Sequence, residues 1–176
     1  MKALGQAVLV VLALAALAAA GPASAGGGAS LTAYLAQVDH ARQPYVKAGA
    51  SLDAALNSLH STPDATWKSA AQKVTASQHA AEKLAAAVAA VAVPAGLEQA
   101  NGQLRQAAVV AAADLKALAA GLNAKSVAKV QAAFNLLSQA RTKVNALNTS
   151  WKNAVTATAH KAGVAVPSWV ATLGSS

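Results

Sequence analysis

The stretch from Pro94 to Leu122 constrains the fold of this chain more than any other part of the sequence. Apolar residues return there every three or four positions, and polar residues such as Gln99, Arg105 and Lys116 lie between them. The repeat runs through Leu97, Asn101, Leu104, Ala108, Ala111, Leu115, Leu118 and Leu122. This spacing predicts a long helix with one apolar side, interrupted only by Asn101. Such a helix is not stable alone in water, so we expect other helices to pack against it.

Three other stretches carry the same kind of repeat. The first begins at Leu31 after Ser30, a suitable N-cap, and the last begins at Val127 after Ser126 and ends at Gly163. For the second, Thr62 is the expected N-cap and Pro63 the first helical residue. Its apolar positions are Trp67, Ala70, Val74, Ser77, Ala81, Leu84, Val88 and Val91. The composition agrees with helices, because alanine dominates a hydrophobic content of 55% and alanine is the best helix former.

Four helices of about 28 to 36 residues, joined by short links, predict antiparallel neighbours. We therefore expect an all-α fold, an antiparallel up-down-up-down four-helix bundle at 31–162, followed by a non-helical tail at 163–176 that folds back over one end of the bundle. Pro44 interrupts the first repeat and predicts either a kink or two short helices that meet at Gln43. The second possibility makes a three-helix bundle with a broken first helix the alternative fold.

The first 25 residues have the pattern of a secretory signal peptide. Lys2 precedes an apolar run from Ala3 to Ala20, and Ala23-Ser24-Ala25 supplies the small residues that a signal peptidase reads. We expect cleavage after Ala25, a flexible start at 26–30, and a secreted or extracytoplasmic protein. The alternative is an uncleaved N-terminal anchor, because the run is close to the minimum length for a membrane span.

The chain is basic, with 14 Lys and Arg against 6 Asp and Glu and a formal net charge of +8. This balance favours weak contact with anionic envelope polymers or lipid head groups. The basic residues are spread singly along the helices, which is not the clustering expected of a nucleic-acid-binding protein. We therefore expect no nucleic-acid partner, whereas the Ala-rich helices leave a homodimer possible.

Few residues have the types and spacing that catalysis or metal binding needs. The sequence contains no cysteine, no Glu-x-x-His pair, no Gly-x-Ser-x-Gly turn and no phosphate-binding glycine loop, so we expect no enzyme activity and no cofactor. The only candidate metal ligands that a bundle would place at similar heights are His40, His79 and Glu82. Their positions in the repeats put them on the outer face, so ordinary exposed side chains are the favoured interpretation.

Arg42, Ser77 and Asn101 occupy core positions. They are either a small polar layer that binds a ligand or, as we favour, residues that specify how the helices align. Trp169 is the one aromatic residue outside the repeats. It is expected to dock on the bundle, with contact to a partner or a membrane surface as the alternative.

The segment Pro94-Ala-Gly-Leu-Glu-Gln-Ala-Asn-Gly-Gln-Leu104 resembles a Pro-x-x-Leu-x-x-Ala-His-x-x-Leu phrase. That phrase opens a helix in small exported Ala-rich helical-bundle proteins of bacteria, whose function is unknown. Asn101 stands where histidine is common in that phrase. The resemblance implies export and a helical bundle and carries no activity.

Together these observations predict an exported, non-enzymatic helical-bundle protein with a structural or interaction role at the cell envelope. The alternative is an extracytoplasmic bundle that binds a metal or a small cofactor.

Overall fold

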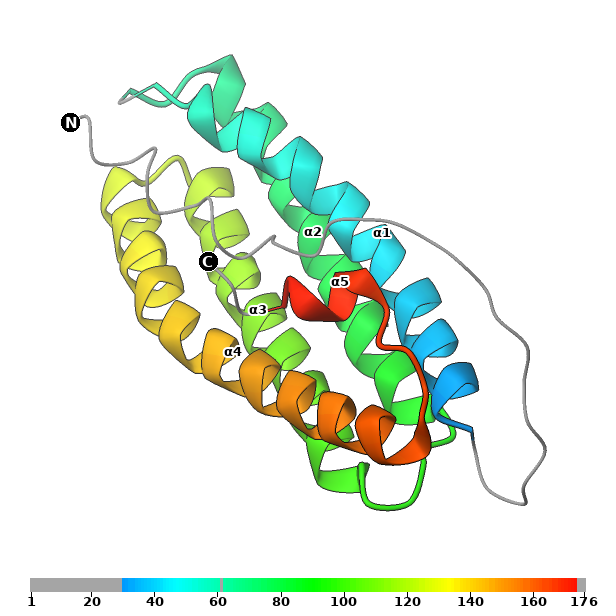
Figure 1. Cartoon of the computed structure of the whole chain (residues 1–176). Helices are drawn as coiled ribbons and strands as arrows, with labels where there is room; N and C mark the ends of the chain where they lie inside the picture. Colours follow the sequence, from blue (N-terminus) through cyan, green and yellow to red (C-terminus); the bar gives the residue numbers. More distant parts are fainter. Residues whose placement is uncertain (1–29, 61, 174–176) are drawn as a thin grey trace.

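The structure is a computed structural model that describes residues 30–60 and 62–173. The predicted signal peptide, its cleavage site after Ala25 and all but the last residue of the flexible start lie outside the described residues. The described chain is all-α. Its helices are α1 (Leu31–Asn57), α2 (Ala65–Ala90), α3 (Glu98–Asn123), α4 (Val127–Ala162) and the single turn α5 (Ser168–Ala171). Figure 1 shows the four long helices side by side, and each of α2, α3 and α4 runs back along the helix before it. The predicted up-down four-helix bundle is confirmed.

The apolar repeats form the core of the bundle. Every position of the α3 repeat from Leu97 to Leu122 is buried, and the α1 and α2 repeats are buried except for partly exposed residues at their far ends, Leu59 and Val91. The predicted α4 repeat is only partly correct, because Val127 is 49% exposed and Val144 and Leu147 are partly exposed. Its other positions are buried: Val130, Phe134, Leu137, Trp151 and Val155.

Helix α1 continues through Pro44 without interruption. The alternative of two short helices meeting at Gln43, and with it the three-helix bundle, is therefore wrong. The proline removes the donor that would bond the carbonyl of His40. Both residues lie on the exposed side of α1, so the missing hydrogen bond is not in the core.

Side-chain caps begin three of the four long helices. Ser30 accepts a hydrogen bond from Ala33 N at 3.1 Å and Ser126 accepts one from Lys129 N at 3.3 Å, as the sequence predicted. The prediction for α2 was wrong, since Asp64 rather than Thr62 is the N-cap and the helix begins at Ala65. The Asp64 carboxylate reaches the free N–H of Thr66 and adds a negative charge at the positive end of the helix.

Helices α3 and α4 approach each other closely just before and after their connection. A Cβ atom on Gly121 would lie 3.0 Å from the backbone nitrogen of Val130, nearer than side-chain atoms normally come. Glycine at this position therefore sets how near the two backbones lie. The α4 helix ends at Gly163, whose φ of 64° is the left-handed conformation that glycine adopts most easily.

The side of the bundle between α1 and α4 is closed by the C-terminal segment. Close backbone packing joins α1 to α2, α2 to α3 and α3 to α4, and α5 lies across the space between α1 and α4 (Figure 1). The tail thus docks along one side of the bundle rather than over its end, and it contains one helical turn. Trp169, Val170 and Leu173 are all buried there. Docking of Trp169 on the bundle is confirmed.

Candidate functional site

A chain of buried hydrogen bonds connects all four long helices. The Trp151 indole N–H on α4 donates to the Tyr34 hydroxyl on α1 at 2.8 Å. That hydroxyl donates to the Asn101 side-chain oxygen on α3 at 3.0 Å. The Asn101 amide in turn donates to the Val88 carbonyl on α2 at 2.9 Å.

The position of each polar group in this series of hydrogen bonds explains why it has a partner. Val88 is in the last turn of α2, where carbonyls have no partner within the helix, so Asn101 supplies the missing donor. Burial raises the pKa of Tyr34, and the hydrogen bond from Trp151 partly offsets that rise. Asn101 therefore acts as the alignment residue that the sequence favoured, and its side chain is occupied within the protein.

Arg42 is buried on α1 and contacts the C-terminal segment. Its Nη2 lies 2.6 Å from the Asp39 carboxylate, one turn earlier on the same helix. Its guanidinium carbon lies 4.4 Å from the centre of the Trp169 ring, which is a cation–π contact. The Trp169 ring also stacks on Trp151 at a centroid distance of 5.7 Å. Arg42 and Trp151 thus both contact the tryptophan that the tail inserts into the bundle.

Ser77, the third polar residue of the predicted core layer, is fully buried on α2. Within the described part of the chain its hydroxyl has no hydrogen-bond partner. Ser77 therefore takes no part in the series of hydrogen bonds through Asn101. The three residues of the predicted polar layer therefore act separately. Asn101 joins helices and Arg42 contacts the tail, whereas Ser77 does neither.

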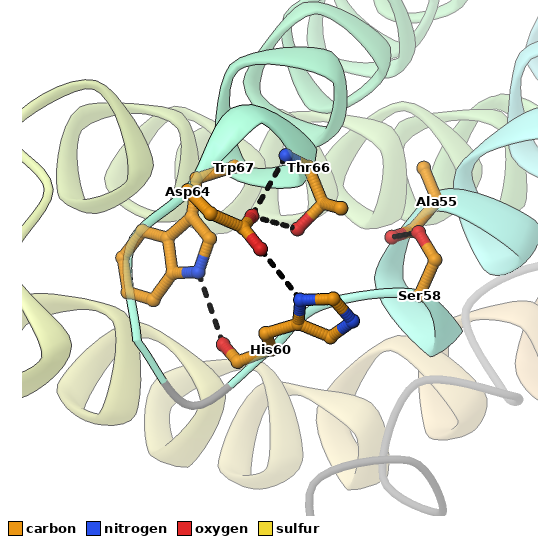
Figure 2. Close-up of polar contacts among 6 residues, drawn as sticks. All are labelled: Ala55, Ser58, His60, Asp64, Thr66 and Trp67. Carbon is orange, nitrogen blue, oxygen red and sulfur yellow. Dashed lines mark hydrogen bonds and ion pairs between the residues drawn. The ribbon is translucent and has the colours of Figure 1, made fainter.

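The connection between α1 and α2 is a compact exposed corner, drawn in Figure 2. Asp64 accepts hydrogen bonds from the Thr66 N–H and hydroxyl at 2.8 and 2.5 Å, and its second oxygen lies 2.5 Å from His60 Nδ1. The Trp67 indole donates to the His60 carbonyl at 3.0 Å, which fixes the turn against the start of α2. The bonds from Thr66, followed by the contact with His60, lower the pKa of Asp64 to about 2. All these groups serve the turn, so the corner is a structural feature.

The candidate metal ligands His40, His79 and Glu82 are all exposed. Glu82 accepts a hydrogen bond from Gln78 at 2.9 Å, one turn earlier on α2. In residues 30–60 and 62–173 no three His, Cys, Asp or Glu side chains come close enough to hold a metal ion. The structure therefore does not bring the three residues together.

Charge is distributed unevenly over the helices, and the reading of the sequence did not recognise this. Residues 30–123 contain seven basic and six acidic residues, whereas residues 124–176 contain six basic residues and no acidic one. The six are Lys125, Lys129, Arg141, Lys143, Lys152 and Lys161. Five of them lie on α4 and Lys125 lies in the connection before it. The described chain has 13 basic and 6 acidic residues, a formal net charge of +7, so α4 alone carries +5 of it. The sequence does carry a signal of this uneven charge, because it contains no Asp or Glu after Asp114.

Comparison with known proteins adds no relative. No family model, curated protein or solved structure matches this chain. Within the described ranges, none of the helices combines the length and the apolar character that crossing a membrane requires.

Proposed function

We propose that this chain is an exported, non-enzymatic helical-bundle protein with a structural or interaction role at the cell envelope, where its basic surface contacts anionic components. The predicted signal peptide at 1–25, which ends in the small residues Ala23-Ser24-Ala25, supports export.

The observation that carries the proposal is that polar residues of the core bind to other parts of the same protein. Tyr34, Asn101 and Trp151 bond to one another and to α2, and Arg42 bonds to Asp39 and contacts the tail. These four polar side chains of the core are used to join the protein's own elements, which suits a scaffold that acts through its surface.

The small size of the space inside the bundle also supports a surface role. A cleft among the four long helices, lined by Tyr45, Leu84, Leu104 and Val144 among others, has a volume of about 30 Å³. A single buried water needs about 10 to 15 Å³ on the same measure, so the cleft has room for about two water molecules. No observation favours the alternative of a bound metal or small cofactor.

Fractionation of the producing cells tests the proposal. The full chain with a C-terminal tag is expected outside the cytoplasm, with an N-terminus at Gly26 after processing. The exported protein is expected to stay on an anionic resin at low salt and to leave it as salt rises, because salt screens surface charges. Recovery from the cytoplasm with the leader intact would overturn the proposed location. Failure to stay on the resin at low salt, or retention that salt does not change, would overturn the proposed anionic contact.

A further inference from the structure

The outer side of α4 carries a line of lysines that no acidic residue interrupts. Lys129, Lys143 and Lys161 are all exposed. Their separations of 14 and 18 residues correspond to about four and five whole turns, so the three side chains lie on the same side of the helix. Leu136, which is 48% exposed, lies on that line midway between the first two. We call Lys129, Leu136, Lys143 and Lys161 the basic face.

Among residues 30–60 and 62–173, no acidic side chain pairs with the lysines of the basic face. The ion pairs found among the described residues, Arg42 with Asp39 and His60 with Asp64, both lie outside α4. The lysines of the basic face extend into solvent, where their charges are available to a partner. A helix with this surface attracts anions along its whole length.

We propose that the basic face is the surface by which this protein lies on an anionic phospholipid bilayer, with α4 parallel to the membrane. This inference rests on the proposed function and names the partner of its basic surface.

The spacing of the lysines favours a flat, extended partner. The line from Lys129 to Lys161 is about 48 Å long, and neighbouring lysines are about 20 to 27 Å apart. A protein that follows a nucleic-acid backbone has basic residues in a denser cluster, often with aromatic residues between them. The aromatic residues of α4, Phe134 and Trp151, are buried in the core. A bilayer presents anionic head groups at every point of a plane and so meets widely spaced lysines on a straight helix.

Leu136 gives the second reason for a bilayer. A large apolar side chain between two lysines gains little from a hydrated polyanion, but it can enter the boundary between the head groups and the acyl chains. Small residues on the same exposed side, such as Ala132 and Ala146, let the helix come close to that boundary.

The test compares two triple variants of the full chain with the same change in net charge. One is Lys129→Gln, Lys143→Gln and Lys161→Gln on the basic face. The other is Lys68→Gln, Lys73→Gln and Lys83→Gln, three exposed lysines of α2, which packs against α1 and α3. Binding is measured to phosphatidylcholine vesicles with and without phosphatidylglycerol. The ratio of the two partition coefficients reports the electrostatic part, because any apolar contribution of the leader is common to both vesicles.

We expect the ratio to fall about fivefold per lysine on the basic face, and thus about a hundredfold for the first triple variant. The α2 variant is expected to lose less than about tenfold, because charges beyond the screening length contribute little. Circular dichroism checks that both variants keep their helix content. Equal losses in the two variants would refute the basic face as the contact, while leaving the anionic contact of the proposed function intact.

Two further measurements separate a bilayer from other anions. Leu136→Gln is expected to weaken binding to phosphatidylglycerol vesicles while leaving retention on an anionic resin unchanged. Tighter binding to duplex DNA than to the vesicles at the same salt concentration would overturn the bilayer in favour of a nucleic acid. Retention on the resin without any preference for phosphatidylglycerol vesicles would overturn the lipid partner alone.

Discussion

Removal of the Tyr34 hydroxyl is the sharpest test of how the bundle is held together. Tyr34→Phe keeps the ring and the packing volume, but it takes away the acceptor of Trp151 and the donor to Asn101 at once. Both partners remain buried, with Trp151 fully buried and Asn101 8% exposed. A buried polar group left without its partner costs about 1 to 3 kcal/mol, so two such groups cost about 2 to 6 kcal/mol.

A loss of that size is large for a protein of this length. It corresponds to a fall in the unfolding midpoint of about 4 to 24 °C, at about 2 to 4 °C per kcal/mol for domains of about 150 to 250 residues. Thermal and urea unfolding, followed by far-ultraviolet circular dichroism, measure the change. The slope of the urea transition is expected to stay the same, because the substitution does not alter the surface exposed on unfolding.

Tyr45→Phe is the matched control. Tyr45 is also buried on α1, and burial alone raises its pKa above the usual range. Among the described residues its hydroxyl makes no hydrogen bond, and its side chain borders the small cleft among the helices. Loss of this hydroxyl is therefore expected to change stability little. If Tyr34→Phe destabilised the protein no more than Tyr45→Phe, the chain of hydrogen bonds would not be what aligns the four helices.

Three further predictions concern the tail, the close helix approach and the exposed corner. Trp169→Ala is expected to cost about 3 to 5 kcal/mol in urea unfolding, since it leaves a cavity between α1 and α4; an unchanged midpoint would show that the tail does not close the bundle. Gly121→Ala is expected to cost about 1 to 3 kcal/mol by forcing α3 and α4 apart. The control is Gly102→Ala, which is expected to be neutral or stabilising because a Cβ there would meet no atom within 4 Å. Equal effects of the two substitutions on stability would refute the close approach. The lowered pKa of Asp64 stabilises the fold above its unfolded value of 3.8, and this stabilisation is lost as pH falls through 3.8 towards 2. Asp64→Asn keeps a capping side chain and is expected to flatten that part of the stability–pH curve; an identical curve would show that the carboxylate contributes nothing.

The repeats in the sequence predicted the helices well because burial follows the helical period. Each position of the α3 repeat is buried, and the one polar residue in it, Asn101, is buried too. The sequence could not name the partners of Asn101. Tyr34 lies 67 residues earlier in the chain, and Trp151 lies 117 residues after Tyr34. No local pattern links residues at those distances.

Other features escaped the sequence because two local signals competed or because a pattern was not counted. Thr62 and Asp64 are both good capping residues, and Asp64 is the cap because its carboxylate also meets His60 and Thr66. The single turn at Ser168–Ala171 is too short to show a helical repeat. The basic face was visible in principle, since it needed only a comparison of charge between the two parts of the chain.

The position of the tail has a consequence for the order in which the protein matures. Trp169, Val170 and Leu173 come after all four long helices in the chain, yet they fill the side between α1 and α4. A nascent chain therefore holds an unfinished interior until this segment has been made. A product that stops at Gly163 would leave Arg42 and Trp151 without the ring of Trp169 against them, a difference that a protease would detect.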